Sequence, residues 1–189
     1  MEEVNDILIA VKNYADQAHG SQMRKFSGER YIAHPVRVME LVLEFNNDVA
    51  VLSAALLHDV LEDTSVSAEE MRAFLETVLP AQEAGRTVDI VIELTDVFVK
   101  RDYPSLNRRV RKDHEFGRLA TVSPEAQTIK YADIIDNVTD IAAHDIDFAP
   151  VYIREAKQML DRMTEGDTRL RERAFHTIEQ SMARIGVRR

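Results

Sequence analysis

The segment of residues 54–63 places four polar side chains on an apolar background. His58 and Asp59 are adjacent, and Glu62 and Asp63 follow four residues after each of them. A helix that continues through the segment would set His58 above Glu62 and Asp59 above Asp63. Carboxylates this close repel one another and are costly to bury unless a cation or shared protons compensate. The segment therefore predicts a divalent-metal site, and the alternative is a solvated helix end.

Two further segments supply candidate ligands for the same ion. His34 stands just before a proline at a predicted loop-to-helix junction, and Asp133 lies inside a later predicted helix. Together with His58 and Asp59 they offer two imidazoles and two carboxylates, a set that suits Mn²⁺, Fe²⁺ or Zn²⁺. Four protein ligands on an ion that accepts six leave room for water and a substrate oxygen. We therefore expect Mn²⁺ rather than a closed tetrahedral zinc site.

Composition limits the class of protein around this site. The 189 residues are 45% hydrophobic and 30% charged, which is ordinary for one globular domain. The net charge of −9 argues against non-specific binding to nucleic acid polymers or to an anionic membrane. Cysteine is absent, which excludes disulfides and thiolate ligands. The acidic start lacks a signal-peptide pattern, and no apolar run approaches the ~18–20 residues that span a bilayer, so a cytoplasmic protein is expected.

The elements that must position these residues are helices. Apolar residues recur at three- and four-residue spacing, which predicts an all-α fold, a single helical bundle over residues 1–189. Helices are expected over about 4–19, 35–45, 48–64, from 67, over 80–96, 105–121, 124–144 and 150–166, and from 167 onward. Asp48, Ser67 and Ser123 are the predicted N-caps. Residues 20–34 and 97–106 are predicted loops, and the end at Arg188 and Arg189 is expected to fray.

Four segments of the chain resemble a known family. Residues 19–25 (His-Gly-Ser-Gln-Met-Arg-Lys), 27–35, 54–64 and 129–133 are similar to the HD-superfamily hydrolase domain of RelA/SpoT-type alarmone enzymes. The similarity extends from about residue 5 to about residue 165, with the motifs in the same order, and the length matches the small alarmone hydrolases, including the metazoan type. The resemblance implies a metal-dependent phosphohydrolase, usually with Mn²⁺, that removes the 3′-pyrophosphate of (p)ppGpp. No synthetase domain is expected, and the oligomeric state stays open.

The resemblance also implies roles for individual residues. The family's four metal ligands correspond to His34, His58, Asp59 and Asp133. Its Glu-Asp pair, which positions or deprotonates the attacking water, corresponds to Glu62 and Asp63. The pair that flanks the purine base corresponds to Arg24 and Lys25, and further contacts to the base or sugar correspond to Ser27, Tyr31 and Asn137. Lys130 could orient a ligand or pair with a carboxylate.

Departures from the family pattern lie around the nucleotide rather than the metal. Arg30 stands where proline is usual, and Ile134, Ile135 and Asp136 replace a basic residue and its neighbours, while Asp140 replaces a common threonine. A related phosphohydrolase acting on a different nucleotide is therefore the alternative. A non-catalytic nucleotide sensor is another, although binding alone would not need the Glu-Asp pair. The basic cluster, defined as Arg108, Arg109, Arg111 and Lys112, could meet distal phosphates or form a solvated helix face.

Overall fold

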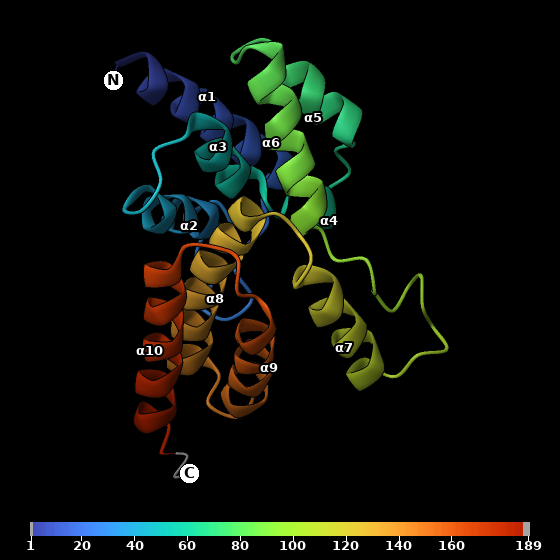
Figure 1. The fold of residues 1–189 in the computed structure, drawn as a ribbon, viewed down its shortest axis with the longest axis vertical. Helices are drawn as coiled ribbons and strands as arrows, with labels where there is room; N and C mark the ends of the chain where they lie inside the picture. The colour runs from blue at the N-terminus through green and yellow to red at the C-terminus, as the bar shows by residue number, and fades with distance from the viewer. Residues whose placement is uncertain (1, 187–189) are drawn as a thin grey trace. The chain divides into compact units, whose positions relative to one another are not determined.

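The computed structural model of the protein describes residues 2–186, and this range is helical with no strand beyond an isolated bridge between Met23 and Arg30 (Figure 1). The all-α prediction is confirmed. The expected fraying at Arg188 and Arg189 lies outside the described residues. The chain divides into two compact units, Met1–Thr95 and Asp96–Arg189, which are described separately. The single domain over residues 1–189 remains a prediction.

The first unit is organised around one buried helix. It contains α1 (Glu2–His19), α2 (Ala33–Leu43), α3 (Val49–Leu57), α4 (Val60–Asp63), α5 (Ala68–Leu75) and α6 (Ala81–Leu94). Helix α3 is buried at every position from Ala50 to Leu57 and contacts α1, α2 and α6. A helix that is apolar on all sides must be surrounded by others, and this one carries the polar pair His58 and Asp59 at its end.

Side-chain caps fix the starts of several helices as predicted. The Asp48 carboxylate accepts the Ala50 N–H at 2.9 Å, and Arg86 pairs with the same carboxylate at 2.7 Å. Ser67 and Glu70 form a reciprocal capping box at the start of α5. Such caps satisfy N–H groups that the first helical turn leaves without partners. They therefore set where each helix begins.

The prediction of one helix running through His58 to Asp63 is wrong. Helix α3 ends at Leu57, and the four-residue α4 begins only at Val60, so His58 and Asp59 lie in the break between the two helices. Neighbouring side chains on a regular helix point about 100° apart and cannot face each other. In the break the Asp59 carboxylate turns back to the His58 imidazole, at 3.1 Å. The predicted end of the helical run is confirmed, because Thr64 follows α4 as its C-cap.

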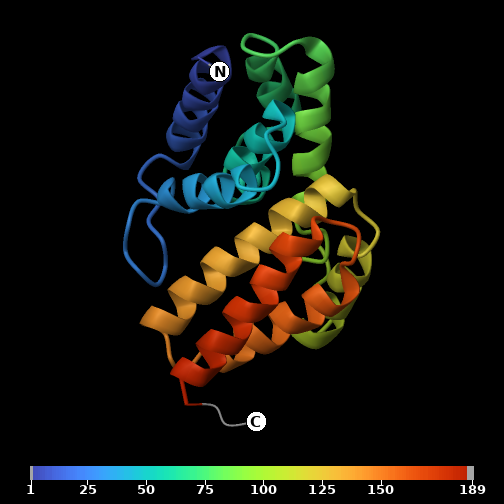
Figure 2. The ribbon, with the colours of Figure 1, turned by 60° about the vertical axis from the view of Figure 1, so that its left-hand side comes forward.

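The second unit packs three helices along one another and adds a fourth. It contains α7 (Arg108–Leu119), α8 (Pro124–His144), α9 (Ala149–Arg162) and α10 (Thr168–Arg184). Helices α8, α9 and α10 contact one another pairwise, and α7 contacts α9 (Figure 2). Helix α7 starts three residues later than predicted, after an Asn107 cap, and α9 stops at Arg162 rather than near Gly166. Among residues 2–186, no helix combines the length and the apolar character that a bilayer crossing would need.

Gly166 allows the segment between α9 and α10 to approach α8 closely. A Cβ atom on Gly166 would come within 2.5 Å of the Tyr131 ring and 2.8 Å of the Thr128 backbone nitrogen. Both neighbours are buried, and the Tyr131 hydroxyl donates to the Met163 carbonyl at 3.0 Å. The glycine is therefore required for its size, since its φ is not positive.

Replacing Gly166 by alanine should destabilise the protein. The added methyl group has no room, and overpacking of this kind costs roughly 1–3 kcal/mol of unfolding free energy. Gly117→Ala is the matched control, because no atom lies within 4 Å of the position that its methyl group would take inside α7. That change should stabilise by about 0.5–1 kcal/mol through helix propensity. Chemical denaturation of both variants measures the difference, and equal stabilities would contradict the assignment.

Candidate metal centre

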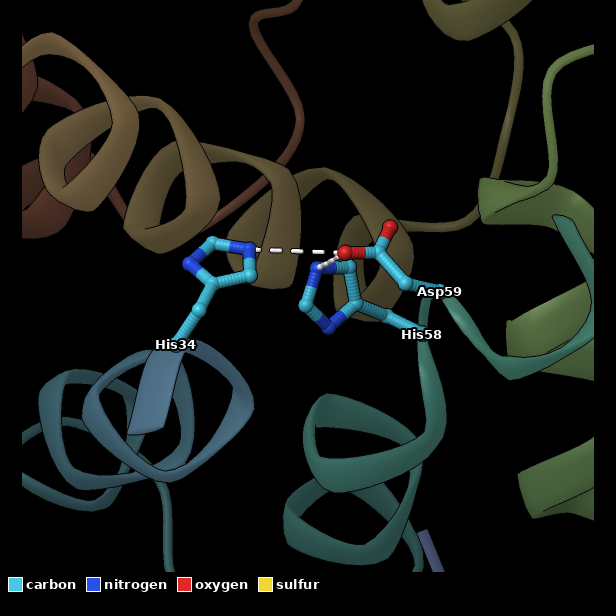
Figure 3. A group of neighbouring side chains, drawn as sticks. All are labelled: His34, His58 and Asp59. Carbon is cyan, nitrogen blue, oxygen red and sulfur yellow. Dashed lines mark ion pairs between the residues drawn. The ribbon is translucent and has the colours of Figure 1, made fainter. Parts of the chain in front are cut away.

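Three side chains of the first unit converge on one point. His34 comes from the first turn of α2, and His58 and Asp59 come from the break after α3 (Figure 3). The Asp59 Oδ2 atom lies 3.4 Å from His34 Nε2 and 3.1 Å from His58 Nε2. One donor atom from each of the three residues lies within 4.8 Å of the others. Both imidazoles are buried, whereas 19% of the Asp59 side chain is exposed, so the group is reachable from its carboxylate side.

The His58 ring is held in the orientation that a metal ligand needs. Its Nδ1 atom lies 2.9 Å from the Ala55 carbonyl oxygen. A carbonyl can only accept, so Nδ1 carries a proton, and Nε2 is the ring nitrogen that faces the Asp59 carboxylate. A hydrogen bond from the other ring nitrogen is the usual way in which proteins orient a histidine ligand.

Asp59 remains a carboxylate in this environment. Burial alone would raise the pKa of Asp59, but the charge of His58 and hydrogen bonds from His34 and His58 outweigh it and lower that pKa well below the ordinary value. The Tyr31 hydroxyl donates to Asp59 Oδ2 at 2.6 Å. Burial and then the Asp59 carboxylate raise the pKa of Tyr31, so this hydroxyl stays protonated and remains a donor. Two imidazole nitrogens and a fixed carboxylate oxygen fit a mid-row divalent cation.

The predicted catalytic acids follow directly after these ligands. Glu62 and Asp63 occupy the last two positions of α4, and both are exposed. The Gln22 side-chain amide donates to Asp63 Oδ2 at 3.0 Å. A carboxylate that is solvent-accessible and a few residues from a metal ligand can exchange protons with a water in the site.

The fourth predicted ligand belongs to the second unit. Asp133 is buried on α8, where Lys130 Nζ lies 2.8 Å from its Oδ2 atom and the Asn137 amide donates to its Oδ1 atom. The predicted pairing of Lys130 with a carboxylate is thus present. Within one unit the structure brings together His34, His58 and Asp59, and the contribution of Asp133 to the same ion stays a prediction.

The residues predicted to hold the nucleotide are spread over both units. In the loop after α1, Arg24 is buried with its guanidinium 6.0 Å from the centre of the Tyr31 ring, and Lys25 Nζ lies 5.0 Å from the Phe26 ring centre. The Ser27 hydroxyl oxygen is buried and has no hydrogen-bond partner among the described residues. Asn137 lies in the second unit. Within the first unit, the Arg24 guanidinium and the Tyr31 ring thus lie next to each other.

The residue that departs most visibly from the family pattern in this loop has a local partner. Arg30 pairs with Asp16 on α1 at 2.7 Å. A second ion pair joins Arg37 to Glu29 at 2.6 Å. The loop is therefore attached to both α1 and α2 by charge pairs.

Most cations of the basic cluster on α7 pair within the second unit. Arg108 donates twice to Glu155 on α9, Lys112 lies 3.3 Å from Asp96, and Arg111 donates to the Leu106 carbonyl. Arg109 is exposed beside a cleft of about 810 Å³ between α7 and α9. This pairing favours the solvated-face alternative for the cluster.

Sequence reasoning gave no role to two residues that touch this site. His19 ends α1, and its ring lies against the Tyr31 ring, with centroids 4.4 Å apart. Its Nδ1 atom lies 2.9 Å from Gln22 Oε1, and Gln22 in turn contacts Asp63. Both residues lie in the motif of residues 19–25, but their partner Asp63 is distant in sequence, so spacing alone could not reveal the contact.

Known proteins resemble this chain in sequence and structure. A guanosine-3′,5′-bis(diphosphate) 3′-pyrophosphohydrolase from Aquifex aeolicus is 32% identical over 66% of this chain and 16% of its own length. A "probable guanosine-3′,5′-bis(diphosphate) 3′-pyrophosphohydrolase" from Mycoplasma pneumoniae is 25% identical over 83% of this chain and 21% of its own. The chain thus spans about a fifth or less of these relatives. A solved metazoan orthologue of SpoT, described as hydrolysing ppGpp with a role in starvation responses, superposes with a TM-score of 0.76 at 26% identity, covering 96% of this chain and 97% of that one.

A family model covers most of the sequence. It describes an HD domain and matches residues 11–158, a range that includes the two histidines and the aspartate of the metal centre as well as Asp133. The order of the motifs, the helical fold and the His-His-Asp group all agree with that match. The chain belongs to the HD domain family.

Proposed function

We propose that this protein is a metal-dependent hydrolase that removes the 3′-pyrophosphate of (p)ppGpp. The observation that carries the proposal is the meeting of His34 Nε2 and His58 Nε2 at Asp59 Oδ2. Similarity to (p)ppGpp pyrophosphohydrolases and to a SpoT orthologue supports the substrate. The substrate is a small nucleotide rather than a polymer or a membrane component, and a cytoplasmic location stays a prediction from the sequence.

The metal in this proposal is Mn²⁺, held by His34, His58, Asp59 and Asp133. A divalent ion supplies Lewis-acid chemistry there, since it lowers the pKa of water and neutralises charge on phosphate oxygens. Support for the ligand set comes from the orientation of the His58 ring by the Ala55 carbonyl and of Asp59 by Tyr31. The pairing of Asp133 with Lys130 supports its remaining a carboxylate.

The protein side chains handle the proton in this proposal. Glu62 accepts a proton from the attacking water, and Asp63 orients that water. Their exposure on α4, just beyond Asp59, supports these roles. Asp59 would hold the metal as a carboxylate, and the Tyr31 hydroxyl, which donates to it at 2.6 Å, fixes the orientation of that side chain.

The nucleotide in this proposal lies with its base at Arg24 and Lys25 and with its sugar near Ser27, Tyr31 and Asn137. An arginine guanidinium can stack on a purine, and a lysine can meet a carbonyl or phosphate oxygen. The buried Ser27 hydroxyl, which lacks a partner among residues 4–186, is suited to a hydrogen bond with a ligand.

A different nucleotide is the second candidate substrate. Ile134 and Asp136 are buried on α8 where the family has a basic residue and its neighbours. Losing a cation and gaining a carboxylate both disfavour a highly anionic ligand. A nucleotide with fewer negative charges would be repelled less by Asp136 and would depend less on the missing basic residue. The sensor alternative gains no comparable support, because Glu62 and Asp63 are both present.

Removal of the metal should abolish hydrolysis. Dialysis against a chelator should eliminate turnover, and Mn²⁺ should restore it. His58→Ala should lose bound metal in elemental analysis, because one of the converging nitrogens is gone. His176→Ala is the matched control, since His176 is exposed on α10 and should leave the metal content unchanged. Equal metal content in the two variants would remove the site from consideration.

The Glu62→Gln substitution should slow the chemical step without weakening the binding of metal or nucleotide. The amide keeps the size of the side chain but cannot accept a proton, so kcat should fall by ~10²-fold or more. Metal content and nucleotide affinity should change little. Glu69→Gln, an exposed glutamate on α5, is the control and should keep full activity. Near-normal turnover of Glu62→Gln would mean that a group other than Glu62 accepts the proton of the attacking water.

Product analysis tests the substrate. Hydrolysis of ppGpp should release pyrophosphate and leave the 5′ phosphates intact. Arg24→Ala should weaken nucleotide binding by ~1 kcal/mol, about fivefold in Kd, by losing a stacking contact. Arg184→Ala, at the exposed end of α10, is the control. Cleavage at the 5′ end, or rapid turnover of another nucleotide with none of ppGpp, would favour the second candidate.

A further inference from the structure

A chain of contacts links the end of α1 to the predicted catalytic acids. His19 Nδ1 lies 2.9 Å from Gln22 Oε1, and Gln22 Nε2 lies 3.0 Å from Asp63 Oδ2. His19 is buried, Gln22 is half-buried and Asp63 is exposed. The contacts therefore run from the interior of the unit out to the surface where the water would be handled.

The Asp63 carboxylate determines the direction of both hydrogen bonds that link His19, Gln22 and Asp63. A carboxylate only accepts, so the Gln22 amide must present its NH₂ group to Asp63 and its oxygen to His19. That oxygen also only accepts, so His19 must carry its proton on Nδ1. The His19 Nε2 atom is buried and has no hydrogen-bond partner among the described residues, so a proton there would be unsatisfied. Two separate arguments thus give the same tautomer.

The same histidine also supports the group that holds Asp59. The His19 ring lies against the Tyr31 ring at a centroid distance of 4.4 Å and an angle of 32°. The Tyr31 hydroxyl is 2.6 Å from Asp59 Oδ2. His19 therefore contacts two side chains, Gln22 and Tyr31, each of which holds one of the two aspartates.

Helix α4 needs this support because it is too short to be rigid by itself. It comprises only Val60–Asp63, a single turn, and isolated helical turns are unstable. Asp63 is its last residue, and Gln22 contacts it from 41 positions away in the sequence. The hydrogen bond from Gln22 therefore restricts a carboxylate that a single helical turn holds only weakly.

We propose that His19 and Gln22 are positioning residues that fix Asp63 for hydrolysis, with His19 selecting the orientation of the Gln22 amide. The proposal rests on the proposed function, because it concerns the orientation of an acid in that reaction. Their side chains contact each other, Tyr31 and Asp63, and neither residue belongs to the proposed metal ligands or nucleotide contacts. Their effect should therefore appear in kcat rather than in KM or in metal content.

Matched substitutions separate the hydrogen bond of His19 from its ring. His19→Phe keeps an aromatic ring against Tyr31 but removes the donor to Gln22, whereas His19→Asn keeps an N–H near the Nδ1 position. Gln22→Met keeps the length of the side chain without the amide. His19→Phe and Gln22→Met should each lower kcat by roughly tenfold, as expected for a misplaced catalytic group. KM and metal content should stay within about twofold of wild type, and His19→Asn should restore most of the loss in kcat.

A double-mutant cycle distinguishes positioning from general damage to the fold. In an Asp63→Asn background, Gln22→Met should cause no further loss of kcat, because the group that it positions is already gone. Gln17→Met, an exposed change on the same end of α1, should leave kcat unchanged. Additive losses in the double mutant, or equal losses in His19→Phe and His19→Asn, would overturn the proposal.

Nitrogen NMR of the wild-type protein supplies a readout that needs no substrate. The His19 ring should carry its proton on Nδ1, and the Gln22 side-chain amide should exchange slowly compared with that of Gln17. In Asp63→Ala, which removes the acceptor oxygens, the slow exchange should be lost. A His19 ring protonated on Nε2 would overturn the proposal even in a protein that hydrolyses ppGpp. The expected spectrum together with no turnover of ppGpp would instead contradict only the choice of substrate, and the cycle would then be run with the nucleotide that is turned over.

Discussion

The site depends on one electrostatic requirement, that a partly buried carboxylate at Asp59 faces two buried imidazoles. Asp59 and His58 are neighbours in the chain, so they can face each other only if the helix is interrupted between α3 and α4. His34 can reach the same oxygen only because α2 packs against α3. The break after α3 and the packing of α2 on α3 together bring the three side chains to one point.

The apolar surroundings make this requirement strict. Helix α3 is buried from Ala50 to Leu57, so water does not reach this helix to solvate the polar pair at its end. Each polar atom must then find a partner in the protein or in a ligand. The Ala55 carbonyl and the Tyr31 hydroxyl provide two of these partners. What holds the site together is thus a small set of directed hydrogen bonds within an apolar environment.

The sequence predicted those features that depend on local chemistry. The caps at Asp48, Ser67 and Ser123 were predictable because each side chain bonds to a backbone group two or three residues away. The break at His58 was not, because the segment contains no glycine or proline and its polar residues have helical spacing. The ligand types were predictable from composition and resemblance, whereas contacts such as that of Tyr31 with Asp59 depend on tertiary packing, which periodicity cannot specify.

The shortness of α4, a single helical turn, has a consequence for how cooperatively the first unit unfolds. Residues in α3 can exchange their amide hydrogens only when much of the first unit opens, whereas α4 is one turn with Glu62 and Asp63 exposed to solvent. The ligand group and the proton-handling group therefore belong to segments of unequal local stability. Since Val60 is the only residue of α4 that is buried, opening of this turn is expected to need less free energy than opening of α3. Such an opening would displace Glu62 and Asp63, whereas His34 and His58 lie outside α4 and would keep their places.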